Sequence, residues 1–381
     1  MANIWEHPSV IAAEALRHLE DALVIGPLCT KDKTSEFTKK ANGWKVGDEV
    51  AFKTHGEYVV KDFVTNIDVQ EIRTSSRVMK IEKHADISVE VTSREAALDL
   101  DSFTEQVILP ASYKLAEDID QYLGSKLLQA QGLYVSPTLY EDAADIAQAR
   151  KTAIIQQLSM NRFSLVDIDI EAKLLGQSWF NQSSTRGRDG ETTLRTGTMG
   201  RVMGMDWYSS ISYPTNITAH TAGTGTGSTN NAAGVNNKIG MTTLTCTALT
   251  AAINAGDRIT IAGVRRPLVV STTAASGATS IALAHPITEI VPDSAAITVV
   301  GSGLDLTFRG AIMDDRALAI AFPMLDLPGD KVCATASSNG INLRIVKGYD
   351  MNTKVDTMSI DLLCGAFMLD PRRVTLVAES A

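Results

Sequence analysis

The spacing of apolar residues predicts two helices in the first third of the chain. Residues 8–25 repeat apolar side chains at helical spacing, and Gly26 followed by Pro27 ends the pattern. A longer pattern starts near Ser102 and continues to residue 131, which predicts a helix of about 30 residues and roughly 45 Å. Because a short lone helix is marginal in water, the apolar face of 8–25 must dock, either on its own domain or on a neighbouring molecule.

Between these two helices, residues 45–92 predict extended β structure. Apolar and polar residues tend to alternate there, as they do in half-buried strands. The segment holds few large apolar residues for its length. A ribbon that cannot bury both of its faces alone is a candidate for packing on another subunit.

The middle of the chain predicts a mixture of helix and strand. Helical patterns cover residues 142–158 and 171–175, and a short apolar run at 163–168 predicts a strand between them. Residues 181–201 are polar and rich in Gly, Thr and Arg, so we expect a mobile loop there.

The composition changes near residue 215. Residues 219–237 consist of Gly, Thr, Ala, Ser and Asn with almost no large apolar side chain, which predicts a flexible connection. Short strand-like runs alternate with turns over residues 238–300, which predicts a small all-β insertion. After it the pattern predicts a helix and then three strands, at 314–322, 343–346, 357–368 and 374–377.

Composition and charge narrow the classes of protein that fit. The 381 residues are 44% hydrophobic and 21% charged, which is typical of a soluble globular protein. The longest apolar runs are too short to cross a bilayer, and residues 1–7 do not resemble a secretory signal, so we expect a protein made and kept in a cytosol. A net charge of −9 disfavours a surface that grips nucleic-acid phosphates.

The usual markers of catalysis and metal binding are missing from the sequence. The six histidines form no His-x-x-x-His pair, and the four cysteines at positions 29, 246, 333 and 364 lie too far apart for a zinc ribbon. We expect the cysteines to be reduced and mostly buried. We expect no catalytic residue, no cofactor and no metal, although an enzyme site assembled from distant residues stays open as an alternative.

The order of these segments resembles the HK97-type fold of the major capsid proteins of tailed bacteriophages, and most closely the group typified by the phage P22 coat protein. The resemblance covers nearly the whole chain. It rests on the order of several short strings, which are Ile87-Ser-Val-Glu-Val, Gly204-Met-Asp-Trp-Tyr, Gly256-Asp-Arg-Ile-Thr-Ile and Leu362-Leu-Cys-Gly. Met358 and Gly365 stand where some members of the wider fold place the Asn and Glu of a self-made crosslink, so we expect no such bond.

The resemblance implies an α+β chain with an inserted small all-β domain. It divides the chain into an N-terminal arm, an extended β loop, a spine helix with the peripheral domain, an axial domain, the insertion, the return of the axial domain and the C-terminal strands. The corresponding ranges are 1–33, 34–92, 93–141, 142–215, 216–304, 305–341 and 342–381.

The same resemblance implies a function in shell assembly. The chain would associate with itself into pentamers and hexamers of an icosahedral head in the host cytoplasm, enclose double-stranded DNA without sequence-specific binding, and cooperate with a scaffolding protein and a portal. The aromatic residues that we expect at contacts between subunits are Trp5, Trp44, Phe52, Tyr58 and Phe63. Each of these could instead belong to the subunit's own core. The alternatives are an encapsulin-like compartment that carries protein cargo, and a cytosolic enzyme with an appended β domain.

Overall fold

The fold comes from a computed structural model that divides into two compact units. Unit 1 comprises residues 1–52, 78–126 and 318–369, and unit 2 comprises residues 53–77, 127–317 and 370–381. The structure describes residues 8–31, 34, 37, 40–41, 44–45, 49–53, 76–92, 104–182, 188–211, 220–231, 236–329, 332–350 and 355–380. The seven segments expected from the sequence follow other boundaries, and those boundaries stay predictions.

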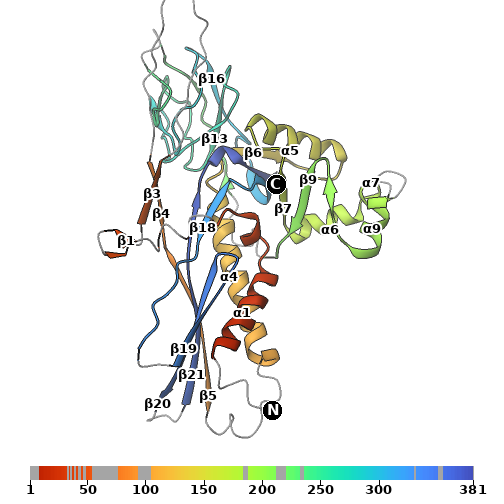
Figure 1. The fold of residues 1–381 in the computed structure, drawn as a ribbon. Helices are drawn as coiled ribbons and strands as arrows, with labels where there is room; N and C mark the ends of the chain where they lie inside the picture. Colours follow the sequence, from red (N-terminus) through yellow and green to blue (C-terminus); the bar gives the residue numbers. More distant parts are fainter. Residues whose placement is uncertain are drawn as a thin grey trace, which may run out of the picture. The chain divides into compact units, whose positions relative to one another are not determined.

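Unit 1 is built on a five-stranded sheet of long strands (Figure 1). The central strand β21 (Val355–Met368) pairs antiparallel with β20, with β18 and, over ten residues, with β5. The other strands are β5 (Lys83–Thr92), β18 (Leu318–Ala321), β19 (Val332–Ser338) and β20 (Ile341–Asp350). The β structure predicted for 343–346 and 357–368 is therefore confirmed.

The two faces of this sheet differ in chemistry because side chains alternate along each strand. Ile345, Ile360 and Ile87 lie side by side in the register of β20, β21 and β5, on the face that helix α1 (Pro8–Ala22) covers. The residues of α1 turned toward the sheet are buried to 3% exposure or less, and they are Ile11, Ala12, Ala15, Leu16 and Leu19. The helix expected at 8–25 is thus confirmed, and it docks on its own chain.

The long helix predicted for 101–131 is shorter than expected. Its first turn, Thr104–Ile108, is a π-helix, and the α-helix α4 follows over Leu109–Leu127. Pro110 lies just after the π-helical turn, and it has no backbone N–H with which to continue the hydrogen bonds of that turn. Residues 128–131 form a turn before strand β6 (Gly132–Ser136), so Gly132 opens a strand and does not end the helix.

Unit 2 is organised around a seven-stranded sheet. Strand β17 (Asp305–Asp314) lies between β22 (Val374–Ser380) and β7 (Arg162–Val166), and both neighbours run antiparallel to it. The outer strands are β6, β8 (Arg201–Val202), β9 (Met205–Ser209) and β10 (His220–Thr221). The strands predicted at 163–168 and 374–377 are confirmed.

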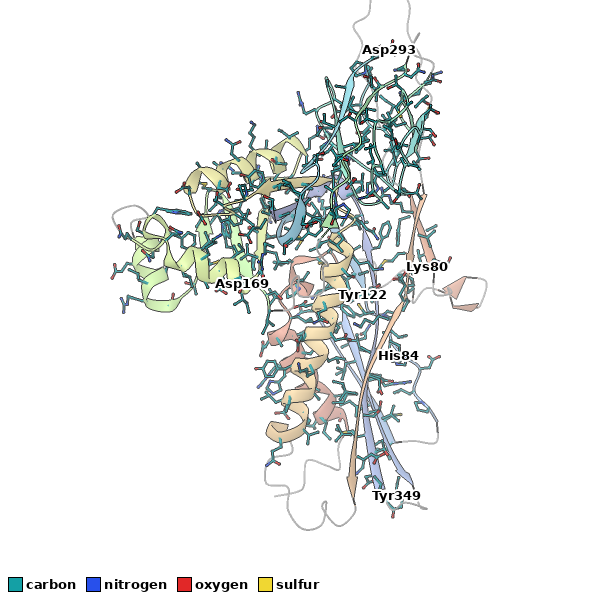
Figure 2. All side chains as sticks on the ribbon, turned by 180° about the vertical axis from the view of Figure 1, so that it is seen from behind. Lys80, His84, Tyr122, Asp169, Asp293 and Tyr349 are labelled. Atoms are coloured by element: carbon teal, nitrogen blue, oxygen red, sulfur yellow. The ribbon has the colours of Figure 1, made fainter. Side chains whose placement is uncertain are left out.

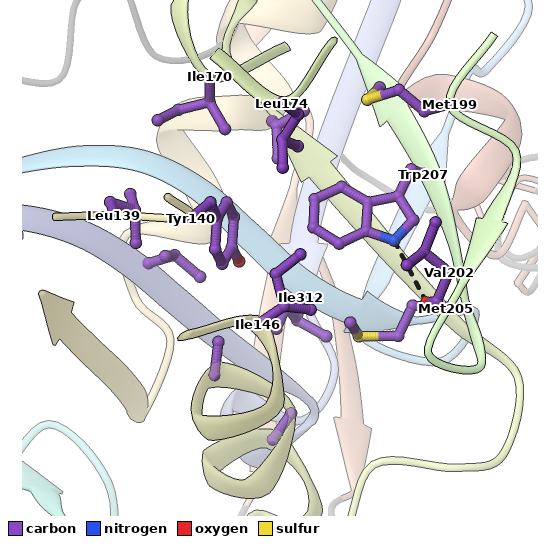
Figure 3. Packing of buried hydrophobic residues seen from close by; sticks show 14 of the residues in the cluster. Leu139, Tyr140, Ile146, Ile170, Leu174, Met199, Val202, Met205, Trp207 and Ile312 are labelled. Carbon is purple, nitrogen blue, oxygen red and sulfur yellow. Dashed lines mark hydrogen bonds between the residues drawn. The ribbon is translucent and has the colours of Figure 1, made fainter. Parts of the chain in front are cut away.

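Helices pack beside this sheet and close its core. They are α5 (Ala143–Ile155), α6 (Ile168–Gly176), α7 (Ser178–Asn181) and α9 (Arg188–Thr196). The core centres on Trp207, whose ring meets Tyr140 edge to face at a centroid distance of 5.4 Å (Figure 3). The helices expected at 142–158 and 171–175 are confirmed. The loop expected over 181–201 is wrong for 188–196, where acidic residues in the first turn support α9 despite its polar composition.

The β-rich segment, defined here as residues 220–304, forms small sheets within unit 2. One has the strand order β11-β16-β13-β14, and the other joins β12 to β15. Their bounds are Gly227–Ser228, Thr243–Thr245, Arg258–Ile261, Leu268–Val269, Ser280–Ala282 and Ala296–Val299, for β11 to β16 in order. The strands predicted between 238 and 300 are confirmed. That the segment is a domain of its own stays a prediction.

The flexible connection predicted for 219–237 is wrong for residues 220–231. The Gly223 N–H donates to the Asp257 carboxylate at 3.0 Å, and Thr229 is 1% exposed. A Cβ at Gly225 would lie 2.5 Å from the Ala251 carbonyl oxygen. The small residues of this stretch therefore serve close backbone packing, which composition alone does not distinguish from a linker.

The helix predicted for 314–322 is also wrong. Strand β17 continues to Asp314, a turn follows, and β18 occupies Leu318–Ala321. Every side chain from Ala317 to Phe322 is buried to 1% exposure or less. A strand that is buried on both faces shows no alternation, so its short apolar run cannot be told from a buried helix by periodicity.

Candidate functional site

The described part of the chain contains no group of three or more His, Cys, Asp or Glu side chains arranged to hold a metal ion. No helix in the described ranges is long and apolar enough to span a membrane. The four cysteines are free thiols, three of them buried and Cys333 half-buried, as expected from the sequence. Burial raises the pKa of the Cys364 thiol to about 12, which keeps it protonated at neutral pH.

Of the five predicted contact residues, the structure describes the side chain of Phe52 alone. Phe52 is half-buried at the end of strand β3 (Glu49–Lys53) and faces Phe367 of β21 at a ring-centroid distance of 6.5 Å. Both rings pack against a small buried cluster of Phe37, Met79 and Ala321. Trp44 lies in the short strand β2 (Trp44–Lys45), which pairs with β1 (Lys40–Ala41), and its side chain is outside the described residues. Trp5, Tyr58 and Phe63 lie outside the described residues altogether.

A two-stranded ribbon lies within the range of the expected β loop, which itself stays a prediction. Strand β3 pairs with β4 (Ser76–Lys80), and an ion pair joins Glu49 at the start of β3 to Lys80 at the end of β4. The two strands therefore run in opposite directions. Gly365 of β21 allows the close approach of this ribbon, since a Cβ there would lie 2.7 Å from the Lys80 carbonyl oxygen.

The face of the unit 1 sheet opposite α1 is polar; we call it the polar face. At its centre Arg344 donates two hydrogen bonds to the Asp361 carboxylate, and the Asp361 residue is 4% exposed. His84, which Figure 2 labels on β5, lies with its Nε2 atom 3.4 Å from the same carboxylate. Hydrogen bonding to Asp361 raises the pKa of Arg344 and so favours its charged form.

Strand β5 supplies the most exposed part of the polar face. Its side chains on this face are exposed, and they are His84, Asp86, Ser88 and Glu90. Asp86 accepts hydrogen bonds from Ser88 at 2.9 Å and from Ser359 of β21. No described helix or strand covers these four positions. They form an open, hydrogen-bonding surface that runs along β5 from residue 84 to residue 90.

Two polar anchors hold the long helix and the N-terminal segment of unit 1. The Asp120 carboxylate of α4 accepts hydrogen bonds from the Val24 N–H at 2.8 Å and the Ile25 N–H at 3.1 Å. Burial raises the pKa of Asp120 to about 6, although these hydrogen bonds act in the opposite direction. On the exposed side, Lys126 donates to Glu82 at 2.5 Å and lowers the pKa of that carboxyl.

The β-rich segment of unit 2 is tied to the turn after α4. Arg258 is 3% exposed, and its guanidinium donates to the carbonyl oxygens of Leu128 at 2.7 Å and Ala130 at 2.9 Å. The side chain of Gln131 donates to the Pro267 carbonyl oxygen at 2.6 Å. Sequence analysis did not find this anchor. Arg258 entered the sequence analysis only as part of the string Gly256-Asp-Arg-Ile-Thr-Ile.

Comparison with solved structures places this architecture among known folds. A structure from Mycobacterium phage Che8 matches with a TM-score of 0.52 and 13% identity, over 93% of this chain and 90% of that chain. The capsid of cyanophage P-SCSP1u gives a TM-score of 0.48 and 12% identity, over 88% of this chain and 84% of that chain. The mature capsid of bacteriophage PhiM1 gives 0.47 and 12%, over 87% and 82%. No family model and no curated protein matches the sequence.

The Che8 match spans nearly the full length of both chains. The chain has an HK97-type capsid fold. At 13% identity the likeness concerns the fold alone. It does not single out the P22-like group, and it does not establish the β-rich segment as an inserted domain, so both stay predictions.

Proposed function

We propose that this chain is the major capsid protein of a tailed bacteriophage, a structural subunit and not an enzyme. The observation that carries the proposal is the match of the HK97-type fold over 93% of the chain, with 90% of the matched chain covered in return. Two proteins of one architecture match in this way, without a large unmatched part in either chain. Because one fold can serve many functions, the proposal also rests on the surfaces that unit 1 exposes.

Two surfaces of unit 1 support assembly. The polar face leaves a row of hydrogen-bonding side chains on β5 exposed, from His84 to Glu90. The β3–β4 ribbon packs on the small cluster around Met79. Contacts repeated head to tail between identical copies need two different surfaces on each copy. Phe52 as an assembly contact stays a prediction, since it is half-buried against its own chain.

The partners follow from the same proposal. Copies of the chain associate in pentamers and hexamers of a closed shell in the host cytoplasm, and a scaffolding protein and a portal take part in its formation. The shell encloses DNA. A net charge of −9 fits a container that does not grip the phosphates of its contents.

The proposal is tested by sedimentation velocity of the chain expressed alone and together with its neighbouring genes. A shell of many copies is orders of magnitude heavier than the 40.9 kDa chain and sediments much faster. A single slow species of one or two chains under both conditions would overturn the proposal.

The encapsulin-like alternative predicts the same shell with different contents. Particles purified from the native source are treated with nuclease and protease and then opened. Protected double-stranded DNA favours the phage head, whereas protected protein cargo without DNA favours the compartment. An enzyme with an appended β domain predicts no shell in either preparation.

A further inference from the structure

The turn that follows α4, residues 128–131, is enclosed by side chains of the β-rich segment. The guanidinium of Arg258 donates hydrogen bonds to the carbonyl oxygens of Leu128 and Ala130. The carbonyl between them, that of Gln129, bonds to the Nε2 atom of His285 at 3.0 Å. Three successive carbonyl groups thus find their partners on two side chains of one segment.

The second ring nitrogen of His285 also has a partner. Its Nδ1 atom lies 2.9 Å from Nη2 of Arg77, at the start of strand β4. A carbonyl oxygen can only accept a hydrogen bond, and a guanidinium can only donate one. Nε2 therefore carries the proton and Nδ1 accepts, which fixes His285 as one neutral tautomer with both nitrogens used.

The surroundings of His285 oppose a positive charge on the ring. The residue is 9% exposed, and burial lowers its pKa to about 4. Arg77 from β4 and Arg258 from β13 act in the same direction, whereas the Gln129 carbonyl and Asp370 favour the charged form. A proton on Nδ1 would place an N–H of His285 against an N–H of Arg77. The hydrogen bond would be lost, and two positive charges would face each other.

We propose that His285 is an acid-released latch, which holds the start of β4 and the β-rich segment together on the turn after α4. In the neutral form one ring bridges two parts of the chain that lie far apart in sequence, Arg77 and Gln129. Protonation breaks the bridge to Arg77 first, because that bond depends on the lone pair of Nδ1. The latch belongs to the folded subunit and does not depend on the function proposed above.

The direction of the pH dependence follows from the two states of the histidine. Released His285 titrates near 6.5, and latched His285 stays neutral down to about pH 4. The latch is therefore at full strength above pH 6.5 and weakens as the pH falls from 6.5 to 4. Each pH unit in that window favours the released state up to about tenfold, so we expect about 100-fold more opening at pH 4.5 than at pH 7.

Hydrogen–deuterium exchange of the full chain at pH 4.5 and pH 7 tests the latch, after correction for the intrinsic pH dependence of exchange. The informative amides are those of Ala130 and Ala284, which bond to Leu127 and Val269 at 2.9 Å and flank the two sides of the latch. We expect their protection to fall about 100-fold at pH 4.5 in the wild type. Protection that is equal at both pH values would overturn the proposal.

Two variants separate His285 from the other titrating groups. In His285→Gln the amide can still donate to Gln129 and accept from Arg77 but cannot titrate, so protection at pH 4.5 should stay at its pH 7 level. His84→Gln removes an exposed histidine of unit 1 and should behave as the wild type. An unchanged pH dependence in His285→Gln would contradict the latch.

A measurement on the unmodified chain covers the case in which His285→Gln fails to fold. Nitrogen-15 NMR of histidine-labelled protein reports the tautomer and the titration of each ring. One ring should show the Nε2–H tautomer and stay neutral to about pH 4. If every ring titrates near pH 6.5, the latch does not exist.

Discussion

The two large sheets of this chain differ in whether one or both of their faces are buried. In unit 2 the neighbouring residues Ala311 and Ile312 of β17 point to opposite faces and are both 0% exposed. In unit 1 the neighbouring residues Ser359 and Ile360 of β21 differ, since Ile360 is 1% exposed and Ser359 belongs to the polar face. The unit 2 sheet is therefore enclosed on both faces and the unit 1 sheet on only one.

This difference separates the parts of the chain that make a stable subunit from the parts that face other molecules. A doubly covered sheet offers a neighbour only its rim and the outer surfaces of its helices. A sheet with one open polar face offers a ready surface of side chains and an exposed edge along β5. Substitutions in unit 2 should accordingly act on folding, and substitutions of the exposed residues of the polar face should act on association.

The largest effect is expected from Trp207→Ala in the core of unit 2. Trp207 is 5% exposed and contacts Tyr140 at the centre of the helix-covered core (Figure 3). Truncation leaves a large cavity and should lower the free energy of unfolding by about 3–5 kcal/mol in urea denaturation. Tyr208→Ala on the same strand is the control, because Tyr208 is 38% exposed and should cost about 1 kcal/mol or less. Equal losses in both variants would contradict the enclosed core.

Arg344→Met probes the hydrogen bonds of the buried Asp361 carboxylate on the polar face. It leaves the Asp361 carboxylate, which is 4% exposed, without its main partner, and should cost about 3 kcal/mol in the same assay. The double variant Arg344→Met, Asp361→Leu removes both charges and should recover most of that loss. A double variant that is less stable than Arg344→Met would contradict the assignment of Asp361 as a buried group that depends on Arg344.

Asp120→Asn should change how stability depends on pH. The folded-state pKa of about 6 lies above the ordinary 3.8, so the folded chain binds more protons than the unfolded chain between these values. This contribution is fully present below about pH 3.8 and is lost as the pH rises through 6, which amounts to about 3 kcal/mol. The wild type should therefore lose about 2 kcal/mol more than Asp120→Asn between pH 4 and pH 7, because the contribution is not yet at its full value at pH 4. Parallel urea profiles of the two proteins would contradict this assignment.

The smallest effect on folding is expected from Glu90→Ala on the exposed part of β5. Because Glu90 is exposed, its removal should change the free energy of unfolding by less than about 0.5 kcal/mol. The same variant should reduce the yield of assembled particles, measured by sedimentation, if the polar face carries a contact. A normal yield from Glu90→Ala and from Asp86→Ala together would remove the polar face from the account.

Most elements with a clear period were predictable from the sequence. Helix α1 repeats apolar residues at helical spacing, the strands of the β-rich segment alternate apolar and polar positions, and their predictions are confirmed. The failures have a common physical origin in close packing. Ala317 to Phe322 are buried on both faces of a strand, so their apolar run resembles a helix, and the small residues of 220–231 resemble a linker.

The anchoring residues could not be predicted, for a different reason. Arg258, Asp120 and Arg344 are charged residues that burial makes important, and burial depends on partners far away in the sequence. The aromatic residues proposed from the sequence were chosen by residue type alone. Phe52 shows the limit of that choice, because it packs half-buried on its own chain.

Electron microscopy of the chain expressed with its neighbouring genes tests the central claim most directly. The account predicts closed icosahedral shells in which every subunit has the fold described here, arranged in pentamers and hexamers. A uniform population of monomers or dimers, with no shells of any form in either the single or the combined expression, would contradict it.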